Sequence, residues 1–223
     1  MNQNDFAVAK KAESVLATNK VLRNTYSLLA MTLIFSGLTA GLSVFFDIGR
    51  GMSLVAFGVA FVLMLFVLPK MANSTSGIFA VFAITGLLGV SIGPMLNHYL
   101  SIPGGSQIVT MAFGGTGVIF LALSGYVLTT KKDFTFMGGF LVVGLVVAFI
   151  AILANLFLQM PALSLALSAV IILLMSGFIL YDTGRIINGG ETNYIMATVS
   201  LYISIFNIFS SLLHLLGFAG GDD

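Results

Sequence analysis

One acidic side chain stands at the edge of a long apolar stretch of this sequence. Asp182 lies in Leu180-Tyr181-Asp182-Thr183-Gly184-Arg185, directly after a run without charges at 163–181. A carboxylate at the edge of a membrane segment is costly unless water or a partner satisfies it, which favours a functional role. The alternative interpretation is a wetted helix end, paired with Arg185 one turn further on.

A basic partner for Asp182 is expected on its own side of the membrane. Lys70 and Arg185 are the two candidates, since the topology derived below places both at that side. A cation close to a single carboxylate favours its ionised form. We therefore predict an ion pair at this end of the helices, which protonation of Asp182 would release.

A second group of polar side chains lies inside the last apolar run. It consists of Tyr202, Ser204, Asn207, Ser210, Ser211 and His214. Asn207, Ser211 and His214 share one helical stripe, so they could hydrogen-bond to neighbouring helices or line a wet path, and the first is favoured. The candidate functional polar site is therefore Asp182, Arg185, Lys70, Ser204 and Asn207.

The residue inventory argues against catalysis. The sequence has no cysteine, no H-E-x-x-H motif and no Ser–His–Asp signature, and its two histidines stand far apart. These absences disfavour thiolate chemistry, metalloenzymes and hydrolases. The net charge of +1 and the lack of a basic patch disfavour nucleic-acid binding. We expect no enzyme activity, no metal and no cofactor.

The elements that must position these residues are membrane helices. Only 8% of residues are charged, against about 25% in soluble domains. Apolar runs of helix-spanning length occur at 26–46, 52–69, 77–100, 107–128, 134–158, 163–181 and 194–218. They are apolar on all sides, unlike the alternating strands of membrane barrels. The sequence predicts an all-α polytopic membrane protein, a seven-helix bundle.

Lysine and arginine set the expected orientation, because these residues accumulate in cytoplasmic loops. With the N-terminus inside, the inner segments hold Lys10, Lys11, Lys20, Arg23, Lys70, Lys131, Lys132 and Arg185, and the outer ones hold Arg50 alone. An odd number of crossings then places the C-terminus outside. The polar residues 1–23 form a mobile cytoplasmic tail, and residues 24–223 form the membrane domain.

Two G-x-x-x-G pairs, Gly37 with Gly41 and Gly89 with Gly93, predict close helix packing. Packing within the chain is favoured, and homodimerisation is the alternative. The glycine-rich stretch 114–117 lacks the lysine of a phosphate-binding loop, so it also indicates packing.

Several motifs together resemble the transmembrane Bax inhibitor family. They are Gly93-Pro94, His98-Tyr99-Leu100, Lys131-Lys132-Asp133-Phe134, Leu180-Tyr181-Asp182-Thr183 and the stretch 201–207. The resemblance implies six helices around a seventh. Some members are pH-gated calcium-leak proteins that use two carboxylates on the last two helices. Asp182 matches the first of these positions, but Ser204 stands at the second, which argues against that mechanism here.

Within the family, the stretches 19–26, 189–194 and 197–202 are most similar to a bacterial branch of inner-membrane modulators of the FtsH protease. That resemblance implies an inhibitor and poor substrate of FtsH, with FtsH and its accessory membrane proteins as partners. The alternative is a pH-sensitive calcium or cation leak, with calcium or protons as ligands. A small-molecule transporter is disfavoured, because no clear pair of broken helices is present.

Overall fold

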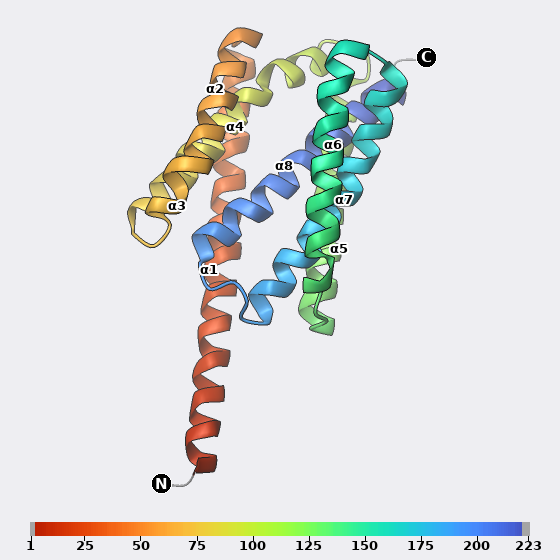
Figure 1. Ribbon diagram of the computed structural model, residues 1–223. Helices are drawn as coiled ribbons and strands as arrows, with labels where there is room; N and C mark the ends of the chain where they lie inside the picture. Colours follow the sequence, from red (N-terminus) through yellow and green to blue (C-terminus); the bar gives the residue numbers. More distant parts are fainter. Residues whose placement is uncertain (1–2, 220–223) are drawn as a thin grey trace.

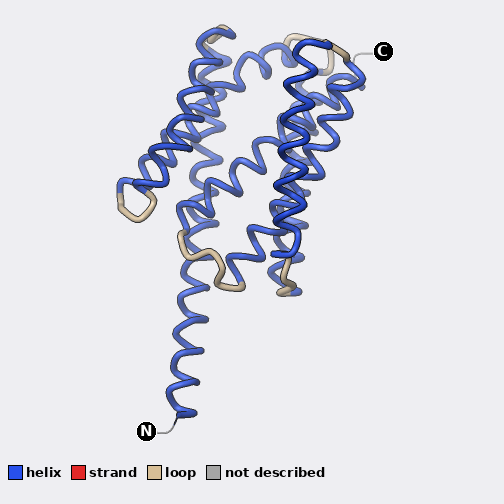
Figure 2. The backbone as a smooth tube through the Cα atoms, viewed as in Figure 1, coloured by secondary structure: helices blue, strands red, loops and turns tan. Residues whose placement is uncertain are grey.

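The computed structural model describes residues 3–219, with side chains described from residue 16 onward. This part of the chain is helical throughout, and only short loops connect the helices (Figure 2). The elements are α1 (Gln3–Phe45), α2 (Arg50–Val62), the π-helical turn η1 (Leu63–Val67), α3 (Leu68–Met71), α4 (Ser76–Leu100), α5 (Gly105–Thr130), the 3₁₀ turn η2 (Thr135–Met137), α6 (Gly138–Leu158), α7 (Pro161–Ile187) and α8 (Tyr194–Ala219).

Seven helical segments in the described residues are long and apolar enough to cross a membrane. Their outward surfaces carry large apolar side chains, such as Phe157 at 88% exposure and Phe136 at 80%. A surface of this kind suits lipid, and helices satisfy their backbone hydrogen bonds without water. The predicted all-α, seven-helix membrane fold is confirmed.

Helix α8 lies at the centre of the bundle, crossing it obliquely (Figure 1). It packs against α1, α4, α5 and α7. Its Leu201, Ile208 and Leu213 are fully buried. By contrast, α6 buries only Leu141 and Ala148 and packs on α7, while α2 packs mainly on α4. The expected central helix is present, but α2 and α6 form an outer layer and do not contact it extensively.

Helices α1 and α4 pack closely against each other. A Cβ atom at Gly89 would collide with the carbonyl oxygen of Ser36, and one at Gly93 would collide with the Ser43 side chain. The hydroxyl of Ser43 donates a hydrogen bond of 2.9 Å to the carbonyl of Val90 across the same contact. This G-x-x-x-G pair therefore serves packing within the chain.

The pair formed by Gly37 and Gly41 lies on the other side of α1. Both residues are exposed, and a Cβ atom at either would meet nothing within 4 Å. This pair does not pack within the chain, so the homodimerisation alternative stays a prediction for it alone.

The second span is broken by a π-helical turn. Leu63–Val67 forms this turn just before Pro69, which has no backbone N–H to donate. A proline removes one helical hydrogen bond and crowds the preceding turn, so the helix must adjust there. The adjustment sets the direction of α3, which ends beside the loop that leads into α4.

Two helices run further than the apolar runs predicted. Residues 3–23 continue α1, and in Figure 1 this end projects away from the bundle. The domain boundary near residue 23 is therefore not a break in secondary structure, and the mobility of this segment stays a prediction. Helix α7 continues past Tyr181 to Ile187, which places Asp182 inside a helix and not at its end.

Candidate functional site

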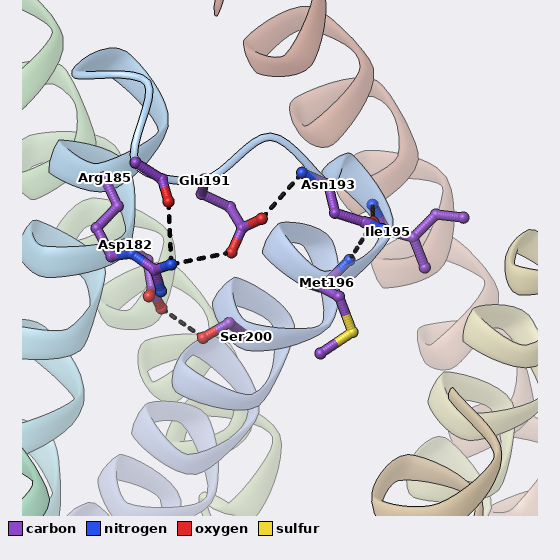
Figure 3. A network of polar contacts seen from close by, with 8 residues as sticks. Asp182, Arg185, Glu191, Asn193, Ile195, Met196 and Ser200 are labelled. Carbon is purple, nitrogen blue, oxygen red and sulfur yellow. Dashed lines mark hydrogen bonds and ion pairs between the residues drawn. The ribbon is translucent and has the colours of Figure 1, made fainter. Parts of the chain in front are cut away.

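The carboxylate of Asp182 is buried between α7 and α8. Asp182 is only 7% exposed, and its neighbour Thr183 is fully buried. The hydroxyl of Ser200 on α8 donates a hydrogen bond of 2.5 Å to Asp182 Oδ2 (Figure 3). Asp182 is thus a buried group with a neutral partner, and the interpretation as a wetted helix end is wrong.

Neither of the two basic partners expected for Asp182, Lys70 and Arg185, forms an ion pair with it. Among the described side chains, the one ion pair within 4.0 Å joins Arg185 to Glu191, with 3.4 Å between Nη2 and Oε2. Arg185 also donates a hydrogen bond of 3.1 Å to the carbonyl of Gly190, and its guanidinium lies 5.6 Å from the Tyr181 ring centroid. The predicted ion pair is wrong, because the α7–α8 loop supplies Arg185 with a closer acid.

Lys70 is exposed at the end of α3. It shares an end of the bundle with Asp182 but forms no ion pair among the described residues. Two of the five predicted site residues, Asp182 and Arg185, come together in this cluster, whereas Lys70 stays outside it.

The two predicted site residues on α8 lie beyond Ser200. Ser204 is buried and donates a hydrogen bond of 3.2 Å to the carbonyl of Ser200, one turn away. Asn207 is half-buried and donates to the carbonyl of Ile203 in its own helix. Ser204 therefore adjoins the Asp182 cluster, while Asn207 has only a local partner.

Asn193, in the loop between α7 and α8, forms hydrogen bonds with the start of α8 and with the loop that follows α3. The side-chain oxygen of Asn193 accepts hydrogen bonds from the backbone N–H groups of Ile195 and Met196, which caps the start of α8. Its side-chain nitrogen donates to the carbonyl of Ala72 and to Asn73 Oδ1, at 3.1 and 2.8 Å. Asn193 thereby links the α7–α8 loop to the α3–α4 loop.

A second polar contact holds the centre of the bundle. The Tyr202 hydroxyl lies 2.5 Å from Ser36 Oγ and donates to the carbonyl of Thr85 at 3.3 Å, so it joins α8 to α1 and α4. Nearer the end of the bundle opposite the start of α1, Ser168 Oγ lies 2.9 Å from His214 Nδ1. The favoured interpretation of the polar stripe in the last run, interhelical hydrogen bonding, is confirmed for His214, whereas Asn207 bonds within its own helix.

Sequence reasoning missed Ser200, Glu191 and Asn193. Ser200 stands four residues before Ser204, so a search for a polar residue one turn earlier on α8 would have found it. Glu191 and Asn193 lie in a short polar loop, and the sequence alone does not indicate which side chains a loop turns inward.

The Asp182 cluster can accept or release a proton, but it offers few ligands to a metal ion. Ca²⁺ takes about six to eight oxygen ligands. Among the described residues, no three His, Cys, Asp or Glu side chains converge. The cluster is a group of polar side chains at one end of the last two helices, with the buried carboxylate of Asp182 at its centre.

Comparison with known proteins identifies the family. A family model described as "Inhibitor of apoptosis-promoting Bax1" matches residues 18–221. The chain belongs to this family. The resemblance carried by the short motifs is therefore confirmed over nearly the whole membrane domain of this Bax inhibitor family protein.

Relatives within the family are close in sequence and in length. The chain is 53% identical over 210 residues to the "Modulator of FtsH protease YccA" of Escherichia coli strain K12, with 94% of each chain covered. It is 46% identical over 223 residues to an "Uncharacterized membrane protein" of Vibrio cholerae, with both chains covered completely. An uncharacterized protein of Pseudomonas aeruginosa is 48% identical over 217 residues, covering 97% of this chain and 96% of that one.

Proposed function

We propose that this Bax inhibitor family protein is an inner-membrane modulator of the FtsH protease that acts without catalysis of its own. The observation that carries the proposal is its 53% identity, over 94% of both chains, to a protein named as a modulator of that protease. A second relative of the same identity is named an inner membrane protein. Partners in the proposal are FtsH and its accessory membrane proteins.

The proposed orientation places the N-terminus in the cytoplasm and the C-terminus in the periplasm. In Figure 1 the two ends of the chain lie at opposite ends of the bundle. The ends of α3, α5 and α7 lie at the same end of the bundle as the start of α1, and the start of α2 lies at the other. Lys70, Lys131, Lys132 and Arg185 belong to or directly follow those three helix ends, whereas Arg50 begins α2. The excess of cations at one end supports a cytoplasmic position for that end.

The proposed inhibition follows from the contrast between the two parts of the chain. As a helix, residues 3–23 extend the chain by about 30 Å, and residues 1–23 drawn out extend by about 80 Å. A protease can engage this polar end. Beyond it, each step of extraction would pull apolar surface into water, at about 25 cal/mol per Å². A bundle held by buried interhelical hydrogen bonds resists such extraction, so the chain occupies the protease as a poor substrate.

The direct test is affinity capture of the full chain from bacterial membranes, followed by identification of what is bound. Recovery of FtsH above the level seen with an unrelated seven-helix protein supports the proposal. Failure to recover FtsH, after mild crosslinking as well as without it, would contradict it.

One observation favours a second candidate, a pH-sensitive cation leak. Asp182 is a buried carboxylate between the last two helices, in contact with α8 through Ser200. A leak predicts calcium flux into liposomes that contain only this protein, with a dependence on pH that Asp182→Asn abolishes. Modulation of FtsH predicts no flux above that of empty liposomes.

A further inference from the structure

A groove opens between α2, α4 and α8 at the end of the bundle opposite the N-terminus. It encloses about 610 Å³, within the range of roughly 300–1,000 Å³ typical of small-molecule sites. Arg50, Ser53 and Phe57 of α2, Met95 of α4, and Phe206 and His214 of α8 are among its lining residues. We call this space the α2–α4–α8 groove.

The groove opens sideways toward the region that lipid tails occupy. Leu54 and Phe57 form part of its wall, and their side chains are 72% and 48% exposed. Because α2 lies outside the central packing, this wall faces the bilayer. A molecule that enters from the hydrocarbon region can therefore reach the groove without passing through water.

The outer end of the groove carries both a cation and an anion. A polar hollow of about 320 Å³ shares Arg50, Pro94 and His98 with the groove and adds Asp47, Asn97 and Ser101. Asp47 Oδ1 accepts a hydrogen bond of 2.6 Å from Asn97. Neither Arg50 nor Asp47 has an ion-pair partner within 4.0 Å among the described side chains.

The start of α2 adds to the positive charge at this hollow. Helix α2 begins at Arg50, and Gly49 before it provides no side-chain cap. The first backbone N–H groups of such a helix are free to bind an anion, and the helix dipole favours one there. A phosphate could therefore contact the guanidinium of Arg50 and these N–H groups together.

An unpaired hydroxyl lies one turn deeper. Ser53 lines the groove, is only 5% exposed, and its Oγ has no hydrogen-bond partner. A buried polar group without a partner is unfavourable. The Oγ atom is covered in this structure, so the Ser53 side chain must rotate toward the groove before it can donate to a ligand oxygen. Ser53 is three residues after Arg50, about 4.5 Å further along the helix. Phe57 follows one further turn on, where the wall is apolar.

The phosphate site, the hydroxyl and the apolar wall follow one another in the same order as the headgroup, the ester and the acyl chain of a membrane lipid. From the surface inward, the groove offers a phosphate site at Arg50, a hydroxyl donor at Ser53 and an apolar wall at Phe57. Asp47 beside Arg50 suits a headgroup that carries an ammonium as well as a phosphate. We propose that the α2–α4–α8 groove binds one aminophospholipid, with its phosphate at Arg50, its ammonium at Asp47, an ester carbonyl at Ser53 and an acyl chain along Phe57.

The occupant is a lipid and not a partner helix, because the polar hollow contains one anionic and one cationic side chain that do not form an ion pair with each other. A transmembrane helix would bring apolar side chains to this depth and leave Asp47 and Arg50 unmatched. An anionic lipid would satisfy Arg50 but bring its negative charge next to Asp47. A zwitterionic amine headgroup satisfies both. This proposal is independent of any role at a protease.

The test is native mass spectrometry of the full chain, purified in mild detergent and equilibrated with equal amounts of phosphatidylethanolamine, phosphatidylglycerol and phosphatidylcholine. We expect one phosphatidylethanolamine to be retained in preference to the other two. Arg50→Gln should lower its retention about tenfold, as expected for loss of a charge-assisted hydrogen bond. Lys131→Gln, which removes a cation at the opposite end, should leave retention unchanged.

Asp47→Asn separates the amine site from the phosphate site. Asp47 has φ of 48°, a conformation that asparagine tolerates, so this variant should fold. It should lose the preference for phosphatidylethanolamine over phosphatidylglycerol while still retaining lipid. Retention that is equal for all three lipids, equal in Arg50→Gln and Lys131→Gln, or replaced by binding of a second copy of the chain would overturn the proposal. Each variant must elute as the parent does, which confirms that the fold is intact.

Discussion

Ser200 on α8 donates a hydrogen bond of 2.5 Å to Asp182 on α7, and this contact satisfies the carboxylate in place of a cation. Arg185, three residues from Asp182, is instead bound to Glu191 and Gly190 of the loop between the two helices. Helix α7 is therefore held twice at this end, to α8 by a partly buried hydrogen bond and to the loop before α8 by an ion pair near the surface.

Removing the hydroxyl at Ser200 should destabilise the bundle more than neutralising Asp182. Ser200→Ala leaves a buried acceptor without its partner, which costs about 1–3 kcal/mol. Asp182→Asn keeps a hydrogen-bonding group at the same place. Thermal unfolding in detergent should rank Ser200→Ala as the less stable variant. Ser210→Ala, which loses only a bond to a carbonyl of its own helix, is the control, and an equal loss for both serine variants would contradict the account.

Asn193 should be the most sensitive position of the α7–α8 loop. Asn193→Ala removes the cap of α8 and the links to Ala72 and Asn73, and loss of a cap alone costs about 0.5–2 kcal/mol. We expect a lower unfolding temperature and faster proteolysis at this end of the bundle. Asn188→Ala, at an exposed residue of the same loop, should behave as the parent. A matching loss there would show that the effect is not specific to Asn193.

The two G-x-x-x-G pairs should respond differently to an added methyl group. Gly89→Ala forces a Cβ atom into the Ser36 carbonyl, and overpacking of this kind costs about 1–3 kcal/mol. Gly41→Ala faces open space, and alanine is the better helix former, so stability should be unchanged or slightly higher. The free energy of unfolding of both variants checks this directly. If Gly41→Ala dissociates an oligomer, the pair has an intermolecular role.

The proposed orientation predicts where a reporter is active. A reporter enzyme that works only outside the cytoplasm should be active when fused after Asp223 and silent when fused after Lys132. The reason is the excess of lysine and arginine at the end that carries the N-terminus. The reverse pattern would contradict the orientation.

The polar N-terminal segment should control the lifetime of the protein. Deletion of residues 2–17 keeps Lys20 and Arg23 for orientation but removes most of the end that a protease can engage. The shortened chain should be long-lived in cells with active FtsH and should interfere more with degradation of other membrane substrates. A lifetime that neither the deletion nor loss of FtsH changes would favour the leak.

The seven spans could be predicted from sequence because lipid imposes a strong constraint on length and composition. The end of α7 could not, because a search for charge-free runs stops at Asp182. The hydrogen bond from Ser200 shows how a carboxylate is accommodated at a buried position inside this helix. That contact depends on how α8 is rotated against α7. The helix over residues 3–23 was missed because its charges indicated a tail, although the absence of proline and glycine there is compatible with a helix.

The most direct test of the proposed function is a degradation assay with purified components. FtsH, a membrane substrate and increasing amounts of this protein are placed in the same liposomes, and loss of the substrate is followed with time. Modulation predicts that substrate degradation slows as the protein is added, while the protein itself is degraded more slowly than the substrate. An unrelated seven-helix protein should have no such effect. Substrate degradation at an unchanged rate at every amount added would contradict the account.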